Sequence, residues 1–243
     1  MKKKTPPCKV IIIGATSGIG REIAKIYAKR GDMIGATGRR TDLLLSLQRE
    51  FPKNIIIEAF DVTGNENIIH LRSLIEKLDG VDIIIYNSGY GDVSRELDYD
   101  LQKKTTDVNV NGFLEIITYG FNYLKNQDNG RLVAISSIAS IRGNPSAPAY
   151  SASKAYMSNY MEGLFLKARK MRSNILVIDI QPGFVDTGMA KGGKFWIAPA
   201  EKAAVQIVDA IDKKKRRAYI TKRWAIIAWL LKQMPFFVFK RIL

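Results

Sequence analysis

The feature that most constrains the fold of this 243-residue chain is a series of short apolar runs. They are rich in β-branched residues, have the length of strands, and are apolar throughout rather than at alternate positions. The runs span residues 10–13, 33–37, 55–59, 81–86, 132–136 and 175–180. Strands of this kind are covered on both faces, so the runs predict a parallel sheet between two layers of helices.

Segments with helical periodicity separate these runs. In residues 19–29, Ile19, Ile23, Ile26 and Tyr27 fall on one stripe, and Gly31 provides a stop. We expect Thr41 to cap a second helix that runs through Leu47, and residues 65–78 to form a third. The alternation predicts one doubly wound α/β domain of Rossmann type over residues 1–220, with a central parallel sheet of about seven strands.

The composition excludes several kinds of site. One cysteine, Cys8, and one histidine, His70, cannot build an internal disulfide, a thiolate zinc site or a histidine-rich metal cluster, so no metal is expected. The chain carries 38 basic and 23 acidic residues, for a net charge of +15. This excess predicts an anionic partner, which could be nucleic acid, a membrane surface or a phosphorylated ligand.

Neither end of the chain contains an apolar run long enough for a membrane-spanning helix, which needs about 18 residues or more. Lysines 2–4 precede the apolar run 10–13, which stops at Gly14 and is too short for an export signal, so we expect a cytoplasmic protein. Residues 221–243 read as a helical appendage in which basic residues alternate with Trp and Phe. One interpretation is that residues 222–243 contact the inner face of an anionic membrane. The two alternatives are that they cap a substrate cleft or form a subunit interface.

Two motifs carry chemistry. Gly14, Gly18 and Gly20 lie between the first strand and the first helix, where backbone amides can approach a phosphate. Their spacing differs from G-x-G-x-x-G, and a tight turn is the simpler alternative. Tyr150 and Lys154 share a helix face, so a cation can stabilise the Tyr150 phenolate for proton transfer without a histidine.

Taken together, the motifs resemble those of the short-chain dehydrogenase/reductase family over about residues 8–220. The matching positions, in the family's order and spacing, are Gly14, Gly18, Gly20, Asn87-Ser88-Gly89, Asn109, Ser137, Tyr150, Lys154, Pro182-Gly183 and Thr187. The resemblance implies a nicotinamide-dependent oxidoreductase that acts on a carbonyl or alcohol group.

The resemblance also implies residue roles. Tyr150 would exchange a proton with the substrate oxygen, Ser137 would hydrogen-bond that oxygen, Lys154 would lower the Tyr150 pKa and bind ribose, and Asn109 would hold a water. The cofactor would contact Gly14, Thr16, Ser17, Gly18, Ile19, Gly20, Arg39, Arg40, Asp61, Val62, Asn87, Ser88, Gly89, Tyr150, Lys154, Pro182, Gly183, Val185 and Thr187. Asn111, Ser136, Ser140 and Ser153 are interpreted as structural neighbours.

Two positions depart from the family pattern, Ile13 in place of Thr and Ser88 in place of Ala, and both bear on cofactor affinity rather than chemistry. The second strand ends in Gly38-Arg39-Arg40, with no carboxylate for a ribose hydroxyl, which favours a 2′-phosphate and hence NADP(H). We expect Arg39 to bind that phosphate. Arg40 could also bind it, or could merely face solvent.

NADPH favours reduction of a ketone or aldehyde. A Gly-rich segment with Gly188, Gly192 and Gly193, followed by Phe195-Trp196-Ile197, suits a lipophilic substrate, although the aromatics could be ordinary packing. A redox sensor without turnover and alcohol oxidation with NAD(P)+ are the alternatives. The family favours a homodimer or homotetramer through the helices that carry Asn109 and Tyr150. The basic run 213–217 is expected to be solvated, so no nucleic-acid partner is predicted.

Overall fold

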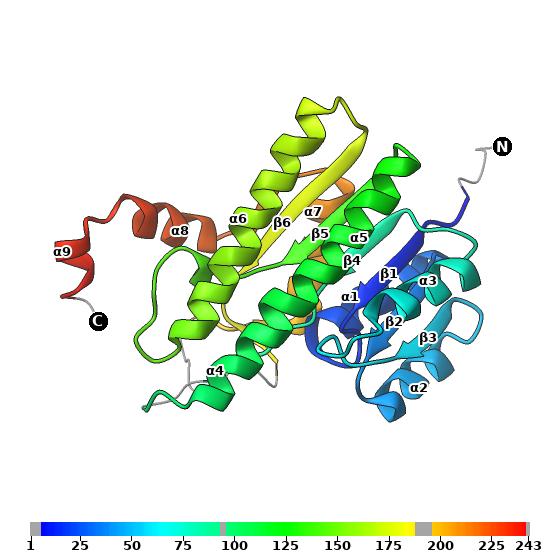
Figure 1. The fold of residues 1–243 in the computed structure, drawn as a ribbon, viewed down its shortest axis with the longest axis horizontal. Helices are drawn as coiled ribbons and strands as arrows, with labels where there is room; N and C mark the ends of the chain where they lie inside the picture. The colour runs from blue at the N-terminus through cyan, green and yellow to red at the C-terminus, as the bar shows by residue number, and fades with distance from the viewer. Residues whose placement is uncertain (1–5, 93–95, 188–195, 242–243) are drawn as a thin grey trace.

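Seven parallel strands form the central sheet of this computed structural model, in the order β3-β2-β1-β4-β5-β6-β9 (Figure 1). The structure describes residues 6–92, 96–187 and 196–241. The strands are β1 (Lys9–Ile13), β2 (Met33–Gly38), β3 (Ile55–Ala59), β4 (Ile83–Tyr86), β5 (Gly130–Ile135), β6 (Ile175–Pro182) and β9 (Arg217–Ile220). Two short strands, β7 (Val185–Asp186) and β8 (Ala198–Pro199), pair separately. The predicted fold class is therefore confirmed.

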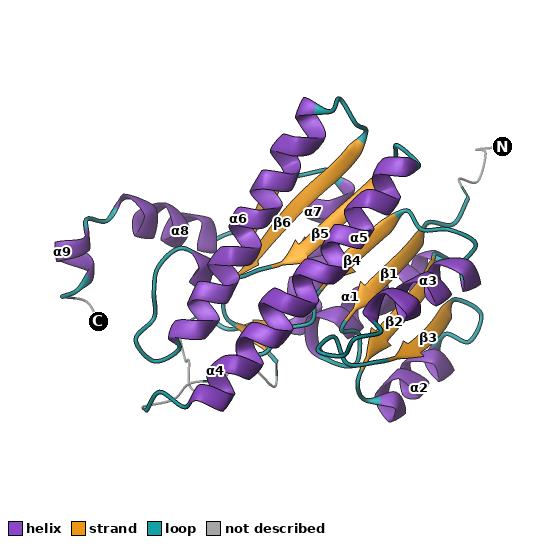
Figure 2. Cartoon of the chain, viewed as in Figure 1, coloured by secondary structure: helices purple, strands orange, loops and turns teal. Residues whose placement is uncertain are grey.

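Helices cover both faces of the sheet (Figure 2). On one face lie α1 (Gly18–Arg30), α2 (Thr41–Glu50) and α7 (Ala200–Asp212). The other face is covered by α3 (Asn67–Lys77), α5 (Phe113–Asn126) and α6 (Pro148–Lys170), and α4 (Tyr99–Thr106) leads into α5 through a single π-helical turn, η1 (Asp107–Gly112). A 3-10 turn, η2 (Ile138–Ser140), follows β5.

Strand β1 shows why its sequence is apolar throughout. Val10 and Ile12 enter the core under α1 and α7, while Ile11 and Ile13 enter the core under α3 and α5. All four side chains are fully buried, because successive residues of a strand point to opposite faces. A polar residue at any of them would be buried, so neither face permits one.

The helix ends were predicted with mixed success. Gly31 ends α1 in the left-handed conformation, with φ of 90°, as expected. The capping role given to Thr41 is wrong, because Thr41 is already helical and the carbonyl of Arg40 accepts the first bond of α2, from Leu44 at 3.2 Å. Helix α2 also continues past Leu47 to Glu50.

The strand order reverses between β1 and β4, where the chain leaves β1 toward β2 on one side and β4 leads to β5 on the other. In such sheets the carboxyl ends at the reversal open a crevice for ligands. Beyond β9, helices α8 (Trp224–Gln233) and α9 (Phe236–Phe239) project away from the sheet domain (Figure 1). No helix among the described residues is long and apolar enough to cross a membrane.

Candidate active site

The turn between β1 and α1 can be made only with glycine. Gly14 has φ of +92°, and a Cβ there would collide with Ser88 at the end of β4. A Cβ on Gly20 would collide with the carbonyl oxygen of Gly14, which also accepts a hydrogen bond from Asn87 Nδ2 at 2.7 Å. Asn87 and Ser88 therefore pack directly against the glycine turn, at the reversal of strand order.

The amino end of α1 is open to an anion. Its N-cap residue, Ser17, forms no side-chain capping bond, so the Ser17 hydroxyl does not satisfy the first backbone amides of the helix. A Cβ on Gly18 would contact the methyl group of Thr187, which places the segment after β6 beside this helix end. Bare amides at a helix amino end attract phosphate, and the glycines leave room for it to approach. The residues present thus fit the pyrophosphate of a dinucleotide.

Arg40 and Arg39, which follow β2, have different partners. The Arg40 guanidinium donates to the hydroxyls of Thr16 and Ser17, at 2.9 and 2.6 Å. The Arg40 side chain is exposed to solvent, as the alternative interpretation expected. It does not merely face solvent, however, because it is also bonded to the glycine turn. Arg39, with a side chain 57% exposed, forms an ion pair with Asp61 at 3.4 Å.

Asp61 follows β3 and is organised locally. It accepts bonds from the backbone and hydroxyl of Thr63, at 3.0 and 2.9 Å. Burial acts to raise the pKa of Asp61, but these bonds and the Arg39 charge outweigh it and lower that pKa. Asp61 is consequently an anion that holds Arg39 at the carboxyl edge of the sheet, while the next residue, Val62, is buried in the core.

Tyr150 and Lys154 lie one turn apart near the start of α6. Lys154 Nζ donates to the carbonyl of Ile135 at 3.0 Å and lies 5.9 Å from the centroid of the Tyr150 ring. Burial lowers the pKa of Lys154 to about 8, and the negative charge of Asp179 opposes that shift. Burial raises the pKa of Tyr150, and a hydrogen bond with Ser137 opposes the rise. The sequence-predicted partners therefore meet in the structure.

Ser137 connects Tyr150 with the end of β6. Its side chain accepts a bond from the Ala139 backbone at 3.1 Å and lies 3.5 Å from the carbonyl oxygen of Pro182. Gly183 follows, where a Cβ would collide with the Trp224 indole, and Val185 is buried in β7. The glycines and Phe195 of the expected substrate-side segment lie outside the described residues.

Asn109 sits in the π-helical turn η1, a distortion that often marks functional sites. Its Nδ2 donates to the Tyr90 carbonyl at 2.7 Å and to Ser153 Oγ at 2.9 Å, and its Oδ1 accepts from the Tyr90 amide at 2.9 Å. Ser153 in turn donates to the carbonyl of Tyr150 at 2.8 Å. The Asn109 side chain thus supports the helix turn that carries Tyr150, and the water-holding role stays a prediction.

Two residues beside Tyr150 escaped the sequence analysis. A Cβ on Gly91 would collide with the Tyr150 ring, so the Gly91 backbone lies directly against the phenol. Both backbone groups of Tyr90 are bonded to Asn109. A signal for this contact is present in the sequence, because a second glycine, Gly91, follows Gly89 by two residues. A glycine without a Cβ lets another side chain, here the Tyr150 ring, pack directly on the backbone.

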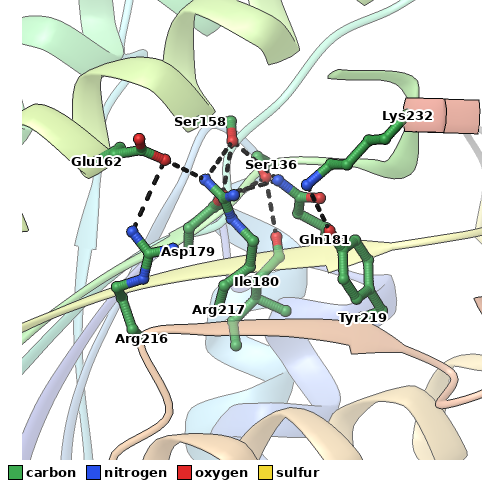
Figure 3. Close-up of polar contacts among 10 residues, drawn as sticks. All are labelled: Ser136, Ser158, Glu162, Asp179, Ile180, Gln181, Arg216, Arg217, Tyr219 and Lys232. Atoms are coloured by element: carbon green, nitrogen blue, oxygen red, sulfur yellow. Dashed lines mark hydrogen bonds and ion pairs between the residues drawn. The ribbon is translucent and has the colours of Figure 1, made fainter. Parts of the chain in front are cut away.

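A buried carboxylate next to the site also escaped it. Asp179, on β6 and 3% exposed, accepts bonds from Ser136 and Ser158, at 2.5 and 2.7 Å (Figure 3). Arg217 and Gln181 complete its partners, at 3.1 and 2.8 Å, and Arg217 also pairs with Glu162 at 3.0 Å. Asp179 thereby links the residue before Ser137 with the turn of α6 that follows Lys154.

The site has known counterparts. The sequence model of the short chain dehydrogenase family matches residues 9–196. The chain belongs to this family. Accordingly, this short-chain dehydrogenase is an oxidoreductase, and the members of its family use a nicotinamide cofactor.

Similar proteins extend over most of the chain. An uncharacterized oxidoreductase of Myxococcus xanthus is 31% identical over 76% of this chain and 75% of its own. One from Mycobacterium tuberculosis is 29% identical over 93% of this chain and 94% of its own. The solved short chain dehydrogenase of Burkholderia cenocepacia, a complex with NADP, has a TM-score of 0.83 at 20% identity and covers 98% of both chains. That structure supports the fold.

Proposed function

We propose that this short-chain dehydrogenase reduces a ketone or aldehyde to an alcohol with NADPH. The observation that carries the proposal is the meeting of Tyr150 and Lys154, near the start of α6, with Ser137, which follows β5. A hydrogen bond with Ser137 acts to lower the pKa of Tyr150, and the Lys154 ammonium lies 5.9 Å from the centroid of its ring. This combination of an acid, a second donor and a cation suits protonation of a carbonyl oxygen.

When bound, the cofactor would supply a hydride to the carbonyl carbon. Tyr150 donates its phenolic proton to the oxygen, and Ser137 donates a hydrogen bond to the same atom. The Lys154 ammonium stabilises the phenolate left on Tyr150, since its pKa of about 8 keeps it mostly charged near neutral pH. Gly91, against the ring, leaves the phenol room at the crevice.

The same proposal assigns the cofactor as NADP(H) rather than NAD(H). The glycine turn and the amino end of α1 would hold the pyrophosphate, as Gly14, Gly18 and Gly20 leave it space. Arg39 and Arg40 are the cations at the end of β2, and an arginine binds phosphate through paired, charge-assisted bonds. Arg39 would then give up its ion pair with Asp61 and bind the 2′-phosphate instead.

We infer a lipophilic substrate and a homodimer or homotetramer. Exposed aromatics beside Gly183 support the first point, because Phe184 and Trp196 are 45% and 37% exposed next to the end of β6. Family resemblance supports the second.

The experiment is to incubate the purified chain with NADPH and a series of straight-chain methyl ketones and aldehydes. The proposal predicts one alcohol formed for each NADPH consumed, with kcat/KM rising as the alkyl chain lengthens. NADH should support a much lower rate. If NADPH binds but no carbonyl in the series is reduced, the proposed reaction is wrong.

A further inference from the structure

The C-terminal arm, defined here as residues 222–241, is fixed to the domain at both ends of α8. Trp224 is 4% exposed, and its ring lies 5.5 Å from that of Phe184 and 6.2 Å from that of Trp196. At the other end, Arg142 donates from Nε to the carbonyl of Leu231 at 2.9 Å and from a second nitrogen to that of Met234. These bonds satisfy one carbonyl in the last turn of α8 and that of its C-cap residue, so they attach this end of the helix to the domain.

The side of the arm that faces away from these anchors is apolar. Ile226, Trp229 and Leu230 recur at the helical spacing of three and four, and they are 63%, 62% and 44% exposed. In α9, Phe236 and Phe237 are 71% and 61% exposed. Single exposed apolar residues are ordinary, but five in one projecting segment form an exposed apolar patch, which is typical of a protein or membrane interaction site.

The charges of the arm have one sign. Residues 213–243 contain no acidic residue. The exposed cations of the arm are Lys222, Arg223, Lys232, Lys240 and Arg241. None of them forms an ion pair with a carboxylate within the described part of the chain, in contrast to Arg216 and Arg217, which pair with Glu162. Lys232 donates to the Tyr219 hydroxyl at 3.1 Å and Arg223 lies over the Trp196 ring, so these two cations have neutral partners. The apolar surface is therefore bordered by cations whose charge no carboxylate among the described residues neutralises.

We propose that the arm docks onto an anionic lipid surface, with the exposed side of α8 and α9 at the boundary between headgroups and acyl chains. Lysine and arginine can keep their charges among the headgroups while aromatic and aliphatic side chains enter the apolar layer. Two arms packed face to face would instead bring like charges together without any acidic partner, which opposes a second copy as the occupant.

Docking would also set the position of the active site. Trp224 packs on Gly183, which follows Pro182, whose carbonyl oxygen is 3.5 Å from Ser137 Oγ. The lipid-facing arm is thus joined by a short chain of contacts to the wall of the crevice. Delivery of a lipophilic carbonyl from the bilayer rests on the proposed function, whereas docking does not.

The test is flotation of the full chain with vesicles of phosphatidylcholine, with or without phosphatidylglycerol. We expect binding to the anionic vesicles and little to the neutral ones, with binding reduced by high salt. Lys232→Gln and Lys240→Gln should each weaken binding about fivefold, the effect expected for one surface cation. Phe236→Ala with Phe237→Ala should weaken it on the order of tenfold or more, and no fold is at risk at such exposed positions.

Matched controls lie on the sheet domain. Lys53→Gln removes an exposed cation and Ile69→Ala an exposed apolar side chain, and neither should alter flotation. Docking is overturned if wild type fails to float with anionic vesicles, if it floats equally with neutral ones, or if the double Phe variant changes the oligomer mass by light scattering without changing flotation. Reduction of a water-soluble ketone should be the same in all these variants, which separates docking from catalysis.

Discussion

The ammonium of Lys154 lies 5.9 Å from the centroid of the Tyr150 ring, one turn further along α6. Lys154 is 4% exposed, and its Nζ donates hydrogen bonds to the Ile135 carbonyl and the Met157 sulfur, neither of which carries a charge. A buried cation without a bonded carboxylate loses its proton more easily than a lysine in water. The protonation state of Lys154 therefore decides whether a positive charge lies 5.9 Å from the Tyr150 ring.

The pH dependence of the reaction follows from this arrangement. The pKa of Lys154 is lowered to about 8, so the ammonium is present below that pH and lost above it. We expect kcat/KM for carbonyl reduction to fall as the pH rises through about 8. The measurement is kcat/KM as a function of pH, which reports the pKa values of the free enzyme. A profile that stays level far above pH 8 would count against Lys154 as the charged partner of Tyr150.

The same shift affects stability. The folded pKa of Lys154, about 8, lies below the unfolded value of 10.5, so between these values the unfolded chain binds more protons. The contribution of Lys154 to the free energy of unfolding must then rise with pH through this window. Urea unfolding of wild type and Lys154→Met at about pH 7.5 and about pH 10 measures it, and the variant should lack this part of the rise.

Replacing Asp179 by Asn should affect both stability and pH profile. The change leaves Arg217 and two serine hydroxyls without a buried anion, and we expect a loss of about 2 to 4 kcal/mol in the free energy of unfolding. Because the Asp179 charge raises the pKa of Lys154, the basic limb of kcat/KM should move to lower pH. Urea unfolding and a pH profile measure the two effects.

Glu162→Gln is the matched control for Asp179→Asn. Glu162 also pairs with Arg217, but its side chain is 43% exposed, against 4% for Asp179. We expect a cost below about 1 kcal/mol and an unchanged pH limb. Equal pH profiles for the two variants would reduce Asp179 to a structural residue.

Cofactor preference should depend on the two arginines after β2. Arg39→Ala and Arg40→Ala should each raise the KM for NADPH on the order of tenfold, as expected for loss of a charge-assisted bond. The KM for NADH should change little. Arg49→Ala, at the exposed far end of α2, serves as the control. A parallel loss for both cofactors would show that the arginines do not read the 2′-phosphate.

Two glycines with the same backbone conformation should differ in their effect on cofactor binding. Gly14 and Gly31 have φ of +92° and +90°, but a Cβ on Gly14 would meet Ser88 and one on Gly31 would meet nothing within 4 Å. Each change to Ala carries backbone strain of about 1 to 2 kcal/mol. In a fluorescence titration with NADPH, we expect Gly14→Ala alone to lose affinity, and equal affinities would contradict the proposed cradle.

Much of the fold is predictable because strand residues are buried on both faces. The run at 10–13 has the length and β-branched composition of a strand, and its four side chains are fully buried. Gly14 was informative because it lies between a predicted strand and a predicted helix, although the glycine loop alone was a weak signal. Helical spacing predicted that Tyr150 and Lys154 share a face, and the family's motif set, rather than the spacing, gave the pair its catalytic interpretation.

The rest of the site depends on contacts between distant segments. Asp179 is a single carboxylate in an apolar run, and its partners Ser136, Ser158 and Arg217 are 43, 21 and 38 residues away. No local pattern joins them. Asn109, in the π-helical turn, is likewise held by bonds to Tyr90 and Ser153, which spacing within one helix cannot reveal.

The proton-transfer role of Tyr150 is tested most directly by the rate of NADPH-dependent carbonyl reduction in Tyr150→Phe, with NADPH affinity measured on the same protein. The variant keeps the ring beside Gly91 and removes only the hydroxyl. We predict that kcat falls by about 100-fold or more, the range for loss of a positioned acid, while NADPH affinity stays near that of wild type. A variant that binds NADPH and reduces the carbonyl at the wild-type rate would contradict the role assigned to Tyr150.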